Sequence, residues 1–233
     1  MNILLSGQGE MAKAVSATCA SQGISCIQIQ KGADYHSLWP PVVAIHFGSG
    51  RQLPELLDIC ENMRIPLIQG STHLIAPIPS NRNIAIINSP NLSIAMIRFM
   101  VAFPAFAEAI KKGMGMRITE SHHEGKQGIS GTALAVANTL GIPESTIWSI
   151  TDPALQVPRG IPHEHLRGHA YHDFTFSDLS DQGVEIVVST KINGRKTYAE
   201  GALTIARKLA SLEKPLKSGV YGPEDILHLL ATK

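Results

Sequence analysis

The stretch that decides the fold is Asn2–Ala12, which reads Asn-Ile-Leu-Leu-Ser-Gly-Gln-Gly-Glu-Met-Ala. Asn2–Ser6 is a short, mostly apolar run that predicts a buried strand, and Ala12–Ser21 predicts a helix. Gly7 and Gly9 stand between them. Strand, glycine turn and helix in this order are typical of a dinucleotide-binding unit, because the glycines let the backbone approach a pyrophosphate at the helix N-terminus. Taken alone, the pattern fits a plain tight turn equally well.

Strands and helices alternate along the first half of the chain. Apolar runs bounded by turn residues predict strands at 23–30, 41–47, 66–69 and 83–88, and a helix at 53–63. This alternation predicts a parallel sheet with right-handed crossovers, in which ligands bind beyond the carboxyl ends of the strands.

The end of the second predicted strand bears on the choice of nucleotide. An acidic residue there favours NAD, because it accepts from the ribose 2′-hydroxyl. This strand instead runs into Gln30 and Lys31. Lys31 is suited to a 2′-phosphate and so favours NADPH, and an exposed surface lysine without a ligand is the alternative.

The second half combines helices with an antiparallel pair of strands. Helices are predicted at 91–112, 132–140, 203–212 and from Gly222 onward, and strands at 114–121, 146–151, 167–177 and 183–191, the last two joined by a turn at 181–183. We therefore expect an α/β protein. We expect an N-terminal Rossmann-like parallel sheet and an α+β domain with an open mixed sheet.

Composition excludes several classes of function. The chain has 233 residues and a formal net charge of +1, so no basic field points to nucleic acid or to an anionic membrane. No apolar run approaches the roughly 20 residues of a membrane span, and the N-terminus does not resemble a secretory signal. Cys19, Cys26 and Cys60 follow no paired spacing and indicate reduced thiols. We expect a cytoplasmic protein without nucleic-acid or membrane partners.

Polar residues with catalytic potential gather in Glu120–Thr132, which reads Glu-Ser-His-His-Glu-Gly-Lys-Gln-Gly-Ile-Ser-Gly-Thr. The stretch joins a predicted strand to the start of a predicted helix, where free N–H groups and the helix dipole suit an anion such as a carboxylate. His122 and His123 can pass a proton near neutral pH, and Lys126 can hold a negative charge or donate a proton. Solvated loop residues without a catalytic role are the alternative.

The arrangement of these residues resembles a family signature. Glu-x-His-His-x-x-Lys followed by Ser-Gly-Thr-Ala resembles dihydrodipicolinate reductase, whose members typically show His-His-x-x-Lys-x-Asp-Ala-Pro-Ser-Gly-Thr-Ala. The segment Gln127–Ile129 is one residue shorter than its counterpart and lacks the Asp-Ala-Pro. Phe47–Ser49, Gly70–Thr72 and Ser89–Leu92 match, in order, the family's segments around the nicotinamide. The segments near Gly168 and Tyr198 also resemble the family, so the resemblance spans nearly the whole chain.

The resemblance implies a reaction and a set of site residues. The reaction is the NAD(P)H-dependent reduction of 4-hydroxy-tetrahydrodipicolinate, on the route to diaminopimelate and lysine. His122 is expected to donate a proton, with Lys126 as a second donor or charge stabiliser. The residues expected to hold the dicarboxylate substrate are His123, Ser130, Gly131 and Thr132. Those expected to bind NADPH or NADH are Gly7, Gly9, Glu10, Met11, Lys31, Phe47, Gly70, Ser71, Thr72, Ser89, Pro90, Asn91 and Leu92.

The resemblance also assigns the two domains and an assembly. It implies that residues 1–93 and 202–233 bind the dinucleotide, and that residues 94–201 bind the substrate and join copies of the chain. The open sheet has an edge that needs cover, and the resemblance suggests a homotetramer formed by joining these sheets.

Two other functions and a metal site remain as alternatives. The shortened segment Gln127–Ile129 allows a related NAD(P)H enzyme that acts on another imine or oxo acid, and a non-catalytic nucleotide-binding protein would bind the cofactor without oxidising it. The remaining potential metal ligands are His163, His165, His169 and His172. We expect no metal, because residues three apart on a strand point to opposite faces and zinc needs converging ligands.

Overall fold

The computed structural model describes residues 1–29, 41–72, 74–126, 128–178 and 183–232. The chain divides into two compact units, one formed by Met1–Arg98 with Lys196–Lys233 and the other by Phe99–Arg195. Lys31, Gln127 and the predicted turn at 181–182 lie outside the described residues. The functions that we assign to the two units stay predictions.

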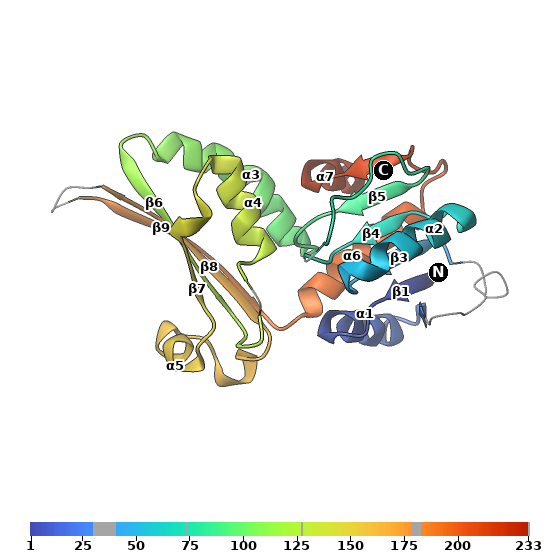
Figure 1. The fold of residues 1–233 in the computed structure, drawn as a ribbon, viewed down its shortest axis with the longest axis horizontal. Coiled ribbons are helices and arrows are strands. Elements are labelled where there is room, and N and C mark those ends of the chain that lie inside the picture. The colour runs from blue at the N-terminus through green and yellow to red at the C-terminus, as the bar shows by residue number, and fades with distance from the viewer. Residues whose placement is uncertain (30–40, 73, 127, 179–182, 233) are drawn as a thin grey trace. The chain divides into compact units, whose positions relative to one another are not determined.

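The first unit contains a six-stranded parallel sheet in the order β10-β5-β4-β3-β1-β2 (Figure 1). Its strands are β1 (Asn2–Ser6), β2 (Ser25–Gln28), β3 (Val43–His46), β4 (Leu67–Gln69), β5 (Ala85–Asn88) and β10 (Gly219–Tyr221). The predicted Rossmann-like sheet is confirmed. The three-residue strand β10 extends the sheet at the β5 edge and was not predicted.

Helices cover both faces of this sheet, because successive residues of a strand point to opposite sides. Leu5 lies in a core with the helices α1 (Glu10–Ser21), α6 (Lys196–Ala210) and α7 (Pro223–Ala231). Its neighbour Leu4 packs in a second core against α2 (Leu53–Met63), which follows the short 3₁₀ turn η1 (Gly50–Gln52).

Helix α6 begins earlier than the predicted Leu203, so that boundary was wrong. Its first turns hold polar residues and Gly201, which obscure the apolar periodicity. Gly201 is needed because a Cβ at this position would lie 1.8 Å from the carbonyl oxygen of Leu92. Glycine therefore lets the helix pack directly against the backbone that leads out of β5.

The second unit contains a four-stranded mixed sheet in the order β7-β6-β8-β9. The strand β6 (Met114–His122) runs parallel to β7 (Ile147–Ile150) and antiparallel to β8 (His169–Asp178), which pairs in turn with the antiparallel β9 (Glu185–Asn193). The predicted mixed sheet is confirmed.

One face of the mixed sheet is covered and the other is open. α3 (Ile94–Ile110), which begins in the first unit, and α4 (Gly131–Leu140) pack on one face around Phe103, Phe174 and Phe176. On the opposite face Trp148 is 53% exposed and Val187 is 48% exposed. Short helical turns connect the strands: η2 (Glu144–Thr146), α5 (Pro153–Gln156), η3 (Val157–Arg159) and η4 (His163–His165).

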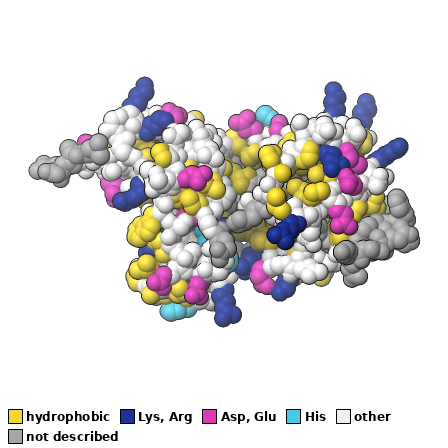
Figure 2. Space-filling model, in the orientation of Figure 1, with side chains coloured by type: hydrophobic (Ala, Val, Ile, Leu, Met, Phe, Trp, Pro, Cys, Tyr) yellow, Lys and Arg dark blue, Asp and Glu magenta, His cyan; other side chains and the backbone are white. Residues whose placement is uncertain are grey.

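The surface agrees with the weak net charge of the sequence. On the face shown in Figure 2, Lys and Arg side chains are interspersed with acidic ones and do not gather into one basic patch. None of the helices in the described part of the chain has the length and apolar character that crossing a membrane requires.

The close approach at Gly201 generates a prediction about stability. Replacing glycine by alanine inside a helix ordinarily stabilises by up to about 1 kcal/mol. Gly201→Ala should reverse that sign and destabilise by about 1–3 kcal/mol, because the new methyl group meets backbone that cannot move aside. Urea unfolding measures the change. A Gly201→Ala variant as stable as the unmodified protein would contradict the packing argument.

Candidate active site

The candidate site is built where β6 ends and α4 begins. Ser130 is the N-cap residue of α4, and its hydroxyl accepts a hydrogen bond from the Ala133 N–H at 3.1 Å. A serine in this position satisfies one of the free N–H groups of the first helical turn, which explains why the helix starts here. The predicted strand and helix on either side of Glu120–Thr132 are thereby confirmed.

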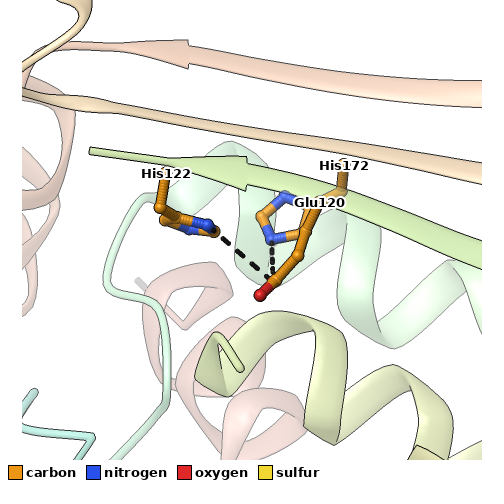
Figure 3. Close-up of side chains that lie close together, drawn as sticks. All are labelled: Glu120, His122 and His172. Atoms are coloured by element: carbon orange, nitrogen blue, oxygen red, sulfur yellow. Dashed lines mark ion pairs between the residues drawn. The ribbon is translucent and has the colours of Figure 1, made fainter. Parts of the chain in front are cut away.

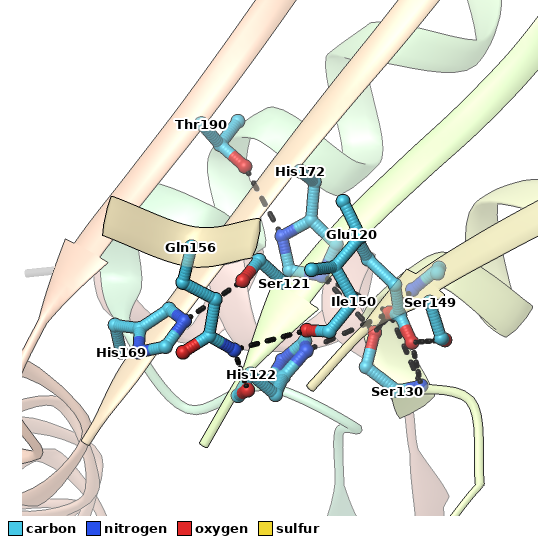
Figure 4. Close-up of polar contacts among 11 residues, drawn as sticks. Glu120, Ser121, His122, Ser130, Ser149, Ile150, Gln156, His169, His172 and Thr190 are labelled. Atoms are coloured by element: carbon cyan, nitrogen blue, oxygen red, sulfur yellow. Dashed lines mark hydrogen bonds and ion pairs between the residues drawn. The ribbon is translucent and has the colours of Figure 1, made fainter. Parts of the chain in front are cut away.

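A buried carboxylate ties the strand to the helix. Glu120 is 2% exposed, and its two oxygens lie 3.0 and 3.2 Å from the backbone N–H of Ser130 (Figure 4). It also accepts from the hydroxyl of Ser130 and from the hydroxyl of Ser149 on β7. Hydrogen bonds at the positive end of a helix dipole therefore stabilise the negative charge of the carboxylate.

His172 approaches the same carboxylate from β8, where it is paired in register with Glu120. Its Nε2 lies 3.0 Å from the Ser130 hydroxyl oxygen and its Nδ1 lies 3.3 Å from the Thr190 hydroxyl oxygen. Burial lowers the pKa of His172 to about 4, and the nearby Glu120 only partly opposes this. The ring is therefore neutral near pH 7.

His122 completes the group from the last position of β6 (Figure 3). It is 8% exposed, and its Nδ1 lies 3.8 Å from Glu120 Oε2. Burial lowers the pKa of His122 to about 2, and His172 and Lys126 add to the effect. The ring of His122 packs edge to face on that of His172, with 5.3 Å between ring centroids.

The backbone of His122 is fixed from a second direction. Gln156, which is fully buried at the end of α5, donates from Nε2 to the His122 carbonyl oxygen at 2.6 Å and to the Ile150 carbonyl oxygen at 3.1 Å. The end of β6 is therefore held to the end of β7.

The loop after β6 adds two basic side chains, His123 and Lys126, whose pKa values are lowered. Burial lowers the pKa of Lys126, although Glu120 acts in the opposite direction. Burial also lowers the pKa of His123, with Arg195 as the next largest cause. Lys126 also lowers the pKa of both His122 and His123, so the three groups act on one another electrostatically.

The three predicted substrate ligands at the start of α4, Ser130, Gly131 and Thr132, differ in their contacts. Both donors of Ser130 are directed at Glu120. Gly131 and Thr132 form the first turn of α4, and Thr132 is buried. Their roles toward a substrate stay predictions.

Sequence reasoning missed the parts played by Glu120, Ser149 and His172. It named His172 only as a potential metal ligand. The available signal was that side chains alternate between the two faces of β8, which places His172 and His169 on opposite faces. His169 instead lies with its Nε2 2.9 Å from the hydroxyl oxygen of Ser121.

Glu120, His122 and His172 also present three atoms of the kind that bind metals, all within 4.8 Å of one another. Ser130 and Ser149 already donate to the carboxylate, and Ser130 lies against His172. Hydrogen bonding therefore accounts for this cluster, and the absence of a metal stays a prediction.

The predicted cofactor residues lie along the carboxyl edge of the parallel sheet. Gly7 has φ +123°, and a Cβ there would lie 2.7 Å from the backbone of Phe47. A Cβ at Gly70 would meet the Phe47 ring at 2.5 Å and Leu92 at 2.7 Å. The positive φ and the backbone contact require glycine at Gly7, and glycine at Gly70 lets the Phe47 and Leu92 side chains pack closely. The role of both residues toward a cofactor stays a prediction.

Hydrogen bonds shape the rest of this edge. The Ser71 hydroxyl donates to the Gly48 carbonyl oxygen at 2.7 Å, and the Ser89 hydroxyl donates to the Asn91 carbonyl oxygen at 2.6 Å. Glu10, in the first turn of α1, pairs with Lys13 at 2.7 Å. The remaining predicted residues in the described part, Gly9, Met11, Thr72 and Pro90, lie in the same turns.

A pocket of about 390 Å³ opens beside the glycine turn. Ser6, Gly7 and Gln8 line it from the β1 side, and Ile29 from the end of β2. Gln52 and Glu55 line it from the η1 and α2 side. It lies beyond the carboxyl ends of β1 and β2, the edge at which ligands of such sheets bind.

Comparison with known proteins identifies the family. The model described as "Dihydrodipicolinate reductase, C-terminus" matches residues 95–227. The chain belongs to the dihydrodipicolinate reductase family. The prediction made from Glu120–Thr132 is confirmed.

Relatives of the dihydrodipicolinate reductase family match over most of this chain. A probable chloroplastic 4-hydroxy-tetrahydrodipicolinate reductase 2 of Oryza sativa subsp. japonica is 29% identical over 207 residues, which are 81% of this chain and 62% of the relative. The 4-hydroxy-tetrahydrodipicolinate reductase of Nitrosospira multiformis is 29% identical, over 74% of this chain and 68% of the relative. The chain spans about three fifths of the length of the plant relatives, from 62% to 58%.

Solved structures support the fold. A dihydrodipicolinate reductase from Paenisporosarcina sp. TG-14 has a TM-score of 0.61 at 15% identity, covering 95% of this chain and 97% of that one. A meso-dapdh variant from Clostridium tetani E88 has a TM-score of 0.55 at 11% identity, covering 100% of this chain and 96% of that one.

The buried histidines generate a prediction about acid stability. Burial lowers the pKa of His46, at the end of β3, to about 4 from its ordinary 6.5. The unfolded chain therefore binds more protons between these values, so stability falls as the pH falls through this window. His46→Gln should reduce the slope of unfolding free energy against pH by up to about 1.4 kcal/mol per pH unit near pH 5.

Urea titrations between about pH 4.5 and pH 7 measure this slope. His228→Gln, at an exposed position of α7, is the matched control and should keep the slope of the unmodified protein. An unchanged slope for His46→Gln would show that His46 does not resist protonation in the folded state.

Proposed function

We propose that this protein catalyses the NAD(P)H-dependent reduction of 4-hydroxy-tetrahydrodipicolinate to tetrahydrodipicolinate, with loss of water. The observation that carries the proposal is the cluster of His122, His123 and Lys126 beside the start of α4, in a chain of the dihydrodipicolinate reductase family. Relatives bear the name of this activity, and the structural neighbour from Paenisporosarcina is described as dipicolinate-bound. We place the reaction in diaminopimelate and lysine biosynthesis.

The residues at the carboxyl edge of the parallel sheet fit a nicotinamide dinucleotide. Gly7 and Gly70 let Phe47 pack closely against the turns after β1 and β4, and Gly9 stands at the N-terminus of α1, which is suited to a phosphate. When bound, the cofactor supplies the hydride. We propose NADPH or NADH, and steady-state assays with each would establish the preference.

His122 is the proton donor in this proposal. The reduced ring must gain a proton, and His122 Nε2 is the atom that we assign to deliver it. The ring is neutral in the unliganded protein because burial lowers its pKa to about 2. Two substrate carboxylates bring negative charge, which raises the pKa of a nearby imidazole and favours uptake of the proton.

Lys126 and the first turn of α4 bind the substrate in this proposal. Lys126 stabilises the substrate's charge, and the backbone N–H groups of Gly131 and Thr132 hold a carboxylate together with the His123 ring. Ser130 contributes through Glu120, because both of its donors point there.

The proposal extends to assembly and location. The open face of the mixed sheet, with exposed Trp148 and Val187, favours a homotetramer joined through these sheets. The three cysteines form no disulfide, which is consistent with a reducing cytoplasm. Sedimentation of the purified protein tests the assembly.

A different imine or oxo acid is the second candidate substrate. The observation that favours it is the segment Gln127–Ile129, which is one residue shorter than the family pattern and lacks Asp-Ala-Pro. Turnover of a panel of cyclic imines and oxo acids with NADPH and NADH separates the two candidates.

The assignment of His122 and Lys126 generates a prediction about turnover. His122→Gln should lower kcat by about 10²–10⁴, the range for the loss of a general acid. Lys126→Ala should also lower kcat strongly, because a developing negative charge loses its counter-charge. The assay follows NAD(P)H oxidation with enzymatically generated substrate.

Lys217→Ala, an exposed lysine in the first unit, is the matched control and should retain normal turnover. Dinucleotide binding by both site variants should be unchanged. Turnover of His122→Gln close to that of the unmodified protein would remove His122 from the mechanism.

A further inference from the structure

The hydrogen atoms around Glu120 can be assigned from the contacts. The Ser130 hydroxyl donates its only hydrogen to Glu120 Oε2. Its oxygen, 3.0 Å from His172 Nε2, must therefore accept from that ring. His172 carries its proton on Nε2, and its Nδ1 accepts from the Thr190 hydroxyl at 3.3 Å. His172 thus donates to the serine and does not compete for the carboxylate.

The carboxylate of Glu120 retains acceptor capacity at Oε2. Oε1 accepts from the Ser149 hydroxyl and, at 3.0 Å, from the Ser130 N–H. Oε2 accepts from the Ser130 hydroxyl and shares the Ser130 N–H at 3.2 Å, which lies closer to Oε1. Its second lone pair is therefore occupied only by this longer, shared contact. The ring nitrogen Nδ1 of His122 lies 3.8 Å from Oε2.

Nδ1 of His122 needs such a partner. Among the residues that the structure describes, this buried atom has no hydrogen-bond partner. A buried polar atom without a partner is costly, and the Glu120 carboxylate is an acceptor 3.8 Å away. Hydrogen bonds between catalytic groups are often long in unliganded proteins and tighten when a ligand binds. A small rotation of the ring would complete this one.

We propose that Glu120 is a positioning residue that holds the His122 proton on Nδ1, leaving Nε2 free to take up a proton and deliver it. Its consequence for turnover rests on the function proposed above, whereas the tautomer of His122 does not. The remaining titratable groups that face His122 are His123, Lys126, His169 and His172. All of them are basic, so Glu120 is the acidic group of this set.

A glutamine at position 120 should reverse the tautomer. The Ser130 N–H only donates and lies closer to Oε1 than to Oε2, so it requires an acceptor at the Oε1 position. The Ser130 hydroxyl at Oε2 can instead rotate and accept. In Glu120→Gln the amide oxygen therefore takes that position and the NH₂ group takes the place of Oε2. The NH₂ group then faces Nδ1 of His122, which must accept, so the ring proton moves to Nε2.

The test reads the tautomer directly. Nitrogen-15 NMR of histidine-labelled protein near pH 7.5 distinguishes a protonated from an unprotonated ring nitrogen, and His122→Gln identifies the His122 signals. We expect a protonated Nδ1 in the unmodified protein and in Glu120→Asp, and a protonated Nε2 in Glu120→Gln. Glu185→Gln, an exposed carboxylate at the start of β9, is the matched control and should leave the tautomer unchanged.

The outcomes separate the proposal from the proposed function. A protonated Nε2 in the unmodified protein, or a tautomer that Glu120→Gln does not change, would overturn the positioning role. The measurement on the unmodified protein decides the matter even if Glu120→Gln fails to fold. A tautomer that behaves as expected in a protein without reductase activity would refute the proposed function alone.

Kinetics add a readout that a purely structural role would not give. Glu120→Gln should lower kcat by about 10²–10⁴, as for other catalytic histidines held in the wrong tautomer. KM for the dinucleotide should stay unchanged, and Glu120→Asp should recover part of the lost kcat. If the unmodified protein is active and a folded Glu120→Gln variant has the same kcat, the proposal is contradicted.

Discussion

The hydrogen bonds from Ser130 to Glu120 are the constraint on which the second unit's site depends. A carboxylate that is 2% exposed cannot be buried without partners, because its desolvation would cost more than packing returns. The backbone N–H and hydroxyl of Ser130 supply those partners from the N-terminus of α4, and Ser149 supplies another from β7. The helix start and two strands are thus fixed around a single negative charge.

This arrangement explains why the site residues come from separate parts of the sequence. Glu120 and His172 meet because β6 and β8 pair antiparallel in register. Glu120 also stands opposite Ser149 because β6 and β7 pair in parallel. A shift by one residue in either pairing would turn these side chains to the opposite face. Register, rather than any local motif, therefore assembles the network.

Much of the fold follows from local sequence patterns. The apolar strand runs, the glycine turn after β1 and the stop at Gly141 after α4 each have a local physical cause, and the structure contains the elements that they predict. β10 escaped prediction because three residues carry too little pattern. Helix α6 was predicted too short because Gly201 interrupts its apolar periodicity. Glycine is needed there because the helix packs against the backbone of Leu92, which is distant in the sequence.

Part of the candidate site could be predicted from the local sequence, and part of it could not. His122, His123 and Lys126 are close in sequence and form a motif, so they could be found without a structure. The network around Glu120 could not, because its members are joined by strand register and by the direction of hydroxyl hydrogens.

The electrostatics of the site have a consequence for ligand choice. Burial lowers the pKa of His122, His123, Lys126 and His172 together. Such a cluster resists protonation, since each added charge repels the others. A ligand with two negative charges reverses that balance, because it offsets both the repulsion and the desolvation. In the proposed reaction, binding of a dianion and uptake of a proton at His122 would therefore favour each other, and a neutral or cationic ligand would gain neither.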